Sequence, residues 1–161
     1  MLFKDKVVII TGGSRGVGAA TAHLFADSGA NLILVARNKA NLDLVVNKLK
    51  SKVKVFGFAM DVSNTADCTS LLKKANSLFG GIDILVNNAG YHSRGLVEDV
   101  GVNDLSKMID VNLKAPIILS KLAIPYLKAS GGGSIVNVAS LAGRVPIPGS
   151  AGYCARKAGL R

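Results

Sequence analysis

Tyr153 and Lys157 have the residue types and the spacing of a proton-transfer pair. Side chains four positions apart share one face of a helix, so the ammonium group of Lys157 would lie near the phenol of Tyr153. A free tyrosine has a pKa of about 10, and a neighbouring cation favours the phenolate form. The pair could therefore exchange one proton with a substrate. Taken alone, the same spacing is also typical of an amphipathic surface pair.

A glycine-rich segment near the N-terminus could hold a second reactant. The stretch TGGSRGVG (11–18) joins an expected strand to an expected helix. Gly12, Gly16 and Gly18 would allow a tight turn, close approach of a phosphate and packing of the helix on the sheet. The N–H groups at the helix start suit a pyrophosphate. The spacing departs from G-x-G-x-x-G, and a purely structural turn is the alternative. Its place in the first strand–helix unit favours dinucleotide binding.

The end of the second expected strand favours NADP over NAD. LILVARN ends in Ala36, Arg37 and Asn38, without the acidic residue that would bind ribose hydroxyls. Arg15 in the glycine-rich turn could reach the same place. Two guanidinium groups and no carboxylate favour a 2′-phosphate. The alternative is that Arg37 is only a solvated strand end.

These residues must be positioned by strands and helices that alternate along the whole chain. Strands are expected at 6–11, 31–37, 53–62, 82–90 and 133–140. Helices are expected at 16–29, 41–50, 66–80, about 103–129 and from about 151 onward. The pattern predicts an α/β fold, a Rossmann-like doubly wound parallel sheet of about five strands with helices on both faces. Ligands bind such sheets beyond the carboxyl ends of the strands.

Three helix details can be predicted from single residues. Gly29 is expected to close the first helix, and Ser63 or Asn64 to cap the third. Pro116 and Pro125 are expected to bend or interrupt the long fourth helix.

Composition bounds the class of protein. The 161 residues fit one domain, and 49% hydrophobic with 19% charged residues indicates an ordered globular chain. No apolar stretch is long enough for a membrane span or a signal peptide, so a cytoplasmic location is expected. Two cysteines, Cys68 and Cys154, and two histidines, His23 and His92, have no metal-ligand spacing. No metal is expected.

The net charge of +10 raises the possibility of a nucleic-acid partner. The basic residues are spread along the chain, and no aromatic residues interleave with them as a base-stacking surface requires. A solvated surface is therefore favoured, and no nucleic-acid partner is expected. Part of the charge could serve a small ligand that carries phosphate.

The whole chain resembles the short-chain dehydrogenases/reductases. The motifs that carry the resemblance, in order, are TGGSRGVG (11–18), DV (61–62), NNAG (87–90), Asn112 in DVNLKAP, Ser140 in SIVNVAS and YCARK (153–157). Each motif is weak alone, but the set is specific.

The resemblance implies a cofactor site and a catalytic set. The implied cofactor-binding residues are Gly12, Ser14, Arg15, Gly16, Val17, Gly18, Arg37, Asn38, Asp61, Val62, Asn88, Ala89, Gly90, Tyr153 and Lys157. Among them, Asp61 would contact the adenine amino group and Val62 the adenine ring.

The implied catalytic residues are Asn112, Ser140, Tyr153 and Lys157. Tyr153 would be the acid/base in hydride transfer between NADP(H) and a small carbonyl or secondary alcohol. Ser140 would hold the substrate oxygen, and Asn112 would anchor a water beside Lys157. Local alternatives remain: Asn112 could bond within its helix, and Ser140 could cap a loop. Arg156 and Cys154, in the same segment, are expected to have only local roles.

Family members usually continue beyond this point, with further strands and a substrate loop. The chain is therefore expected to form a single NAD(P)-binding domain over 1–161 and to be truncated or incompletely represented at its C-terminus. A complete protein is expected to be a homodimer or homotetramer. The second hypothesis is a non-catalytic NADP-binding or scaffold form, and a nucleic-acid binder is the third.

Overall fold

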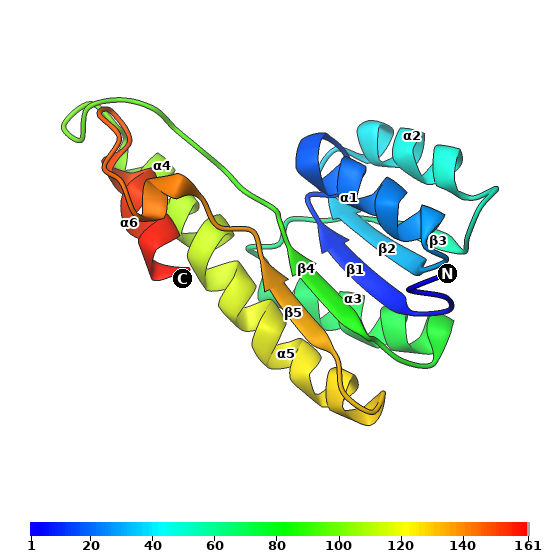
Figure 1. Ribbon diagram of the computed structural model, residues 1–161. Coiled ribbons are helices and arrows are strands. Elements are labelled where there is room, and N and C mark those ends of the chain that lie inside the picture. Colours follow the sequence, from blue (N-terminus) through cyan, green and yellow to red (C-terminus); the bar gives the residue numbers. More distant parts are fainter. Residues whose placement is uncertain (161) are drawn as a thin grey trace.

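Five parallel strands form one sheet in the computed structural model, which describes residues 1–160 (Figure 1). The strands are β1 (Val7–Thr11), β2 (Asn31–Ala36), β3 (Val55–Ala59), β4 (Ile84–Asn87) and β5 (Ser134–Asn137). The helices are α1 (Gly16–Asp27), α2 (Lys39–Leu49), α3 (Thr65–Phe79), α4 (Val102–Ile109), α5 (Ala115–Ala129) and α6 (Ala151–Gly159). A π-helical turn η1 (Asp110–Lys114) and a 3-10 turn η2 (Leu141–Gly143) complete them. The strand order β3-β2-β1-β4-β5 confirms the predicted Rossmann-like doubly wound sheet.

Helices cover both faces of this sheet. In β1, Val7 and Ile9 pack with side chains of α3 and α5, whereas Val8 and Ile10 pack with those of α1 and α2. Figure 1 shows these two helical layers on opposite sides of the strands. Successive side chains of a strand point to opposite faces, so a strand buried on both sides is a continuous apolar run. The strand ends and the turns that follow them are left to form a site.

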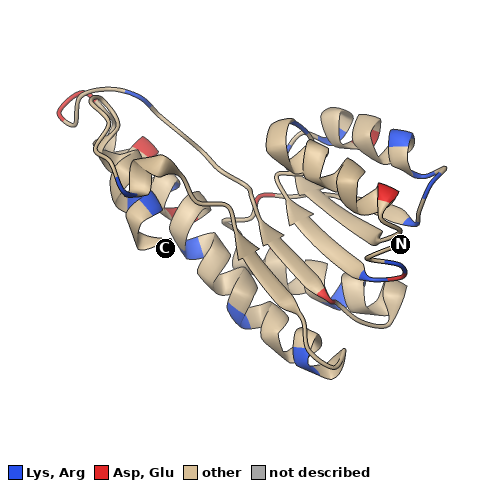
Figure 2. Cartoon of the chain, in the orientation of Figure 1, with Lys and Arg blue, Asp and Glu red and all other residues tan. Residues whose placement is uncertain are grey.

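The surface charge is spread over the molecule. Figure 2 shows Lys and Arg in both helical layers and in the connecting turns. Two exposed pairs, Lys39–Asp43 at 2.6 Å and Lys114–Asp110 at 3.5 Å, join neighbouring turns of a helix. Exposed pairs of this kind contribute little to stability. The net charge of +10 is therefore carried largely by solvated side chains.

The ends of the first and third helices differ slightly from the predicted ones. Helix α1 ends at Asp27, and Gly29 follows it in the left-handed conformation, with φ of +88°. Helix α3 is capped by Asn64. The Oδ1 atom of Asn64 accepts hydrogen bonds from two backbone N–H groups of the first turn, at 2.9 and 3.3 Å. Ser63 instead donates to Asp61.

The long helical stretch is irregular at only one of its two prolines. Pro116 lacks an N–H group, and its ring would clash with the carbonyl of Asn112 in a regular α-helix. The chain widens into the π-turn η1 directly before it. Pro125 lies inside α5 without ending the helix, so the helix is not interrupted there, and a bend at Pro125 stays a prediction. The irregular turn coincides with Asn112, a predicted site residue.

No helix within residues 1–160 is both long and apolar enough to cross a membrane. Nor do these residues contain a group of three or more His, Cys, Asp or Glu side chains that could hold a metal ion.

The Asn64 cap gives a testable stability prediction. Asn64→Ala should lower the free energy of unfolding by about 1 kcal/mol, because two N–H groups lose their acceptor. Urea denaturation measures the change. The matched control is Asn76→Ala at an exposed position in the last turn of the same helix, where alanine is the better helix former and stability should hold or rise. Equal losses from both substitutions would contradict a capping role for Asn64.

Candidate cofactor and catalytic site

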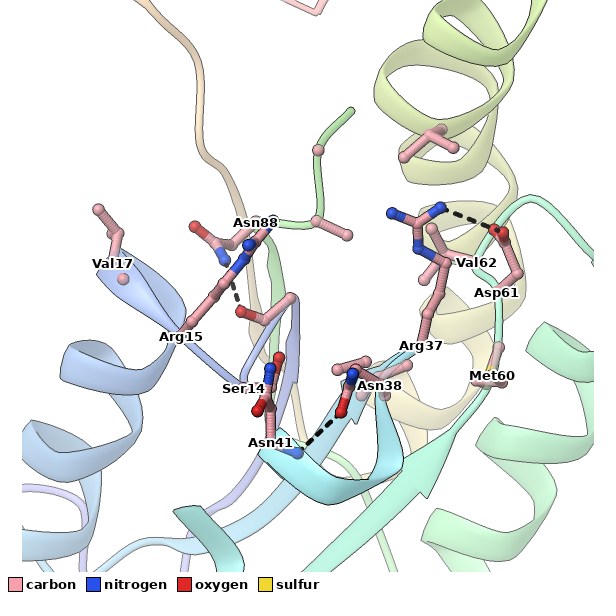
Figure 3. A pocket seen from close by; sticks show the side chains of 17 residues that line it. Ser14, Arg15, Val17, Arg37, Asn38, Asn41, Met60, Asp61, Val62 and Asn88 are labelled. Atoms are coloured by element: carbon pink, nitrogen blue, oxygen red, sulfur yellow. Dashed lines mark hydrogen bonds and ion pairs between the residues drawn. The ribbon is translucent and has the colours of Figure 1, made fainter. Parts of the chain in front are cut away.

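A cleft of about 750 Å³ lies at the carboxyl ends of the strands (Figure 3). It is formed by the turn after β1 and the segments that follow β2, β3 and β4. In the sheet, β2 lies on one side of β1 and β4 lies on the other. The strand order therefore reverses at β1, and the carboxyl ends of β1 and β4 form the switch point. All the residues predicted to hold the cofactor line the cleft except Gly18, Tyr153 and Lys157.

Gly18 lies beneath the cleft, where no side chain fits. A Cβ atom on Gly18 would lie 2.2 Å from the carbonyl oxygen of Gly12 and 2.5 Å from Nδ2 of Asn88. Gly12 itself has a φ of +68°, in the left-handed region. The start of α1 therefore packs directly against backbone, which is the close packing expected of the last glycine in such a turn.

A hydrogen-bond network joins the turn after β1 to the turn after β4. The Oγ1 atom of buried Thr11 accepts from the N–H groups of Asn88 and Ala89, both at 3.0 Å. The Nδ2 group of Asn88 donates to the carbonyl oxygens of Thr11, at 3.0 Å, and Gly12, at 3.3 Å. Sequence reasoning missed Thr11; the available signal was a polar residue ending an otherwise apolar strand.

The rim of the cleft carries two arginines and a carboxylate. Arg37 points toward Asp61, with Nη1 4.0 Å from Oδ2, while Arg15 extends from the glycine-rich turn toward Asn88 (Figure 3). The sequence showed no carboxylate at the end of β2, but the segment after β3 places one beside Arg37. Burial opposes ionisation of Asp61, yet hydrogen bonds from Ser63 and the charge of Arg37 outweigh it and lower the pKa of Asp61. Asp61 is therefore ionised at neutral pH.

Tyr153 and Lys157 lie in α6, beyond the carboxyl ends of β4 and β5 (Figure 1). The Tyr153 ring contacts the His92 ring, with centroids 4.3 Å apart, and the Arg156 guanidinium carbon lies 3.9 Å from the Tyr153 ring centroid. Lys157 is buried, and its Nζ donates to the carbonyl oxygen of Val138 at 2.5 Å. Burial, followed by the charge of Arg156, lowers the pKa of Lys157.

Ser140 lies at the start of η2, which packs tightly against α6. The Oγ atom of Ser140 accepts from the Ala142 N–H at 3.2 Å, so its own hydroxyl proton can still be donated elsewhere. A Cβ atom on Gly143 would lie 2.6 Å from the Lys157 carbonyl oxygen. Ser140 thus caps a turn, as in the local alternative, while that turn lies against the helix of Tyr153.

The amide of Asn112 clamps the segment after β4 to the α4–η1 stretch. Its Oδ1 accepts from the Tyr91 N–H at 3.0 Å. Its Nδ2 donates to the carbonyl oxygens of Tyr91 at 2.9 Å and Met108 at 2.8 Å. The bond to Met108 is the local one considered as an alternative. Within residues 1–160, no hydrogen bond joins the side chain of Asn112 to Lys157.

Two residues given no part in the predicted catalytic set contact Tyr153. The sequence predicts only a local role for Arg156, and it considers His92 only as a possible metal ligand. The sequence offered a signal for Arg156, because residues three positions apart on a helix are neighbours. It offered none for His92, which reaches Tyr153 from a segment about sixty positions earlier only through the tertiary fold.

The comparisons with known proteins agree with this geometry. The family model described as short chain dehydrogenase matches residues 6–161. An uncharacterised oxidoreductase of Staphylococcus saprophyticus is 38% identical over 158 residues, which are 98% of this chain and 64% of the relative. Another, from Thermotoga maritima, is 40% identical over 164 residues, covering 99% and 63%.

A solved structure gives the same result. The crystal structure of a metagenomic short-chain oxidoreductase in complex with NADP superposes with a TM-score of 0.94 at 33% identity, covering 99% of this chain and 73% of that one. The fold and site define a dinucleotide-binding type of α/β protein. The chain belongs to the short-chain dehydrogenase family of oxidoreductases. It spans slightly less than two thirds of the length of the two curated relatives above.

The contact at Gly18 predicts a specific sensitivity. Gly18→Ala should lower the free energy of unfolding by about 1–3 kcal/mol, because the Gly12 carbonyl must move to admit the methyl group. Chemical denaturation measures this change. Gly101→Ala is the control, since no atom lies within 4 Å of a Cβ added there, and its effect should stay below about 1 kcal/mol. Equal stabilities of the two variants would contradict the packing argument.

Proposed function

We propose that this protein transfers a hydride between NADP(H) and the carbon of a carbonyl or secondary alcohol. The observation that carries the proposal is the cleft at the switch point, lined by the glycine-rich turn and bordered by Arg15 and Arg37. Family membership supports an oxidoreductase. The structural neighbour in complex with NADP supports the choice of cofactor.

The residues of the cleft fit a dinucleotide carrying a 2′-phosphate. The backbone of the turn at Gly12 and Gly16 can approach a pyrophosphate, because neither residue carries a side chain. Arg37 and Arg15 would hold the 2′-phosphate by charge-assisted hydrogen bonds. Asp61, whose carboxylate Ser63 orients, would accept from the adenine amino group. When bound, the cofactor supplies the hydride chemistry.

Tyr153 is proposed to transfer the proton to and from the substrate oxygen. In the reducing direction, the Tyr153 hydroxyl gives its proton to the substrate oxygen and becomes phenolate; in the oxidising direction the phenolate takes the proton back. The hydroxyl group of Ser140 donates a hydrogen bond to the same substrate oxygen and keeps its proton. The charge of Lys157 stabilises the phenolate, and two of its three N–H donors remain for a cofactor hydroxyl or water after the bond to Val138.

Asn112 is proposed to support a proton path through its position in the π-turn. Its backbone carbonyl cannot accept the usual i+4 hydrogen bond, because residue 116 is a proline. A water held at this carbonyl could relay a proton between Lys157 and solvent.

Cofactor binding without turnover is the second candidate. It is favoured by one observation: within residues 1–160, no hydrogen bond links the Tyr153 hydroxyl to Ser140. The Tyr153→Phe substitution separates the two candidates.

Tyr153→Phe should reduce turnover of NADPH with a panel of ketones by at least about 100-fold, because it removes only the hydroxyl that carries the proton. Binding of NADPH, followed by nucleotide fluorescence, should change less than about threefold, since one hydrogen bond to an exposed ligand group contributes little. Unchanged turnover in the variant would overturn the role of Tyr153. Tight NADPH binding with no turnover in the parent chain would favour the non-catalytic candidate.

Arg37→Met should weaken NADPH binding about tenfold or more, because a charge-assisted bond to a phosphate contributes about 1.5–3 kcal/mol. NADH binding should be nearly unchanged, since NADH lacks the 2′-phosphate. Competition titrations with both nucleotides measure the difference. Lys39→Met, which removes a nearby exposed cation paired with Asp43, is the control. Equal loss of affinity for the two nucleotides would exclude Arg37 as the selecting residue.

A further inference from the structure

Arg156 is a buried cation that lacks a hydrogen-bond acceptor. Its side chain has a relative exposure of 0%. Within residues 1–160, its Nε, Nη1 and Nη2 atoms are all buried without a hydrogen-bond partner. Burying a charge without a partner is unfavourable, and this burial lowers the pKa of Arg156 to about 10. The compensating contact that the structure provides is the ring of Tyr153, 3.9 Å from the guanidinium carbon.

The other charged groups of this region are engaged elsewhere or neutral. Burial, with the charges of Arg156 and Arg94, lowers the pKa of His92, so the imidazole against the Tyr153 ring is neutral at pH 7. Lys157 is bound to a backbone carbonyl in the segment after β5.

The charged groups of the neighbouring helix face a different tyrosine. In α4, Asp104 accepts from the hydroxyl of Tyr91, and Lys107 lies over the Tyr91 ring at 4.9 Å. In η1, Asp110 pairs with Lys114. The cation in face contact with the Tyr153 ring is therefore Arg156.

A guanidinium over a neutral phenol gains a cation–π contact, whereas over a phenolate it gains an attraction between opposite charges. Ionised Tyr153 acts to raise the pKa of Arg156. Low polarity around the buried guanidinium strengthens this attraction.

We infer that Arg156 is a positioning residue that holds the Tyr153 ring and stabilises its phenolate form, as a second cation besides Lys157. The inference rests on the proposed function, in which Tyr153 gains and loses a proton. In the reducing direction the phenol O–H bond breaks and the new O–H bond forms on the substrate. The phenolate left behind then lies against a guanidinium that has no other counter-ion among residues 1–160.

The test is a spectroscopic titration of Tyr153 in the chain without cofactor. Near-ultraviolet absorbance reports tyrosinate, and subtracting the matching Tyr153→Phe protein removes the signals of Tyr91 and Tyr126. In Arg156→Met, the ratio of tyrosinate to tyrosine at Tyr153 should fall about tenfold or more at a given alkaline pH, because an adjacent opposite charge is lost. Arg156→Lys should retain part of the effect, because it keeps a cation without the planar guanidinium.

Resistance to thermal unfolding separates this role from a purely structural one. Arg156→Met should unfold at the same or a higher temperature, because it replaces an unpaired buried charge by an apolar side chain. The control Arg94→Met removes an exposed cation near His92 and should leave the tyrosinate ratio unchanged. A folded Arg156→Met protein with the parent's ratio, or an equal fall in Arg94→Met, would overturn the inference.

If Arg156→Met does not fold, Arg156→Gln removes the charge while keeping polar donors, and a parental ratio in that variant would also overturn it. Because the titration needs neither NADPH nor turnover, its outcome is independent of the outcome for hydride transfer. A lowered ratio together with an inactive parent chain would reject the proposed function alone.

Discussion

The contact between the turn after β1 and the turn after β4 is the constraint on which the cleft depends. The two turns approach so closely that a Cβ atom on Gly18 would lie 2.5 Å from Nδ2 of Asn88. Thr11 and Asn88 then satisfy the backbone groups that this approach would otherwise bury without partners. The bottom of the cleft is therefore formed by backbone atoms and by the side-chain amide of Asn88. A surface of this kind can approach phosphate groups closely.

The segment that leaves β4 connects this contact to the side of the molecule that carries α6, Tyr153 and Lys157. A Cβ atom on Gly90 would lie 3.0 Å from Oδ1 of Asn112. The amide of Asn112 also forms hydrogen bonds with the backbone N–H and carbonyl groups of Tyr91. Asn112 lies in the π-turn that precedes Pro116. Helix α4, which leads into this turn, packs against α6 at Gly152, where a Cβ atom would lie 2.9 Å from Leu105. The side-chain amide of Asn112 therefore links the segment that borders the cleft to the segment that packs against α6.

The charged groups at the two ends of this arrangement differ in their exposure to solvent. At the rim of the cleft, Arg37 and Asp61 are partly exposed, so solvent screens their attraction and a phosphate can compete for the arginine. At α6, Arg156 and Lys157 are both buried within one turn, and the charge of Arg156 disfavours the protonated form of Lys157. Two buried cations favour negative charge nearby, and the phenol of Tyr153 is the group proposed to acquire it.

The sequence by itself determined the alternation of strands and helices in a parallel sheet, the glycine-rich turn and twelve of the seventeen residues that line the cleft. Apolar runs buried on both faces and glycines without room for side chains leave a strong pattern along the chain. It did not determine that Asn64 rather than Ser63 caps α3, since both residue types are good caps. Only the tertiary structure decided that Asp61 lies beside Arg37, that His92 contacts Tyr153 and that Arg156 is buried. The two contacts join side chains on different elements, and the burial of Arg156 depends on how deeply α6 packs. Local sequence pattern specifies neither.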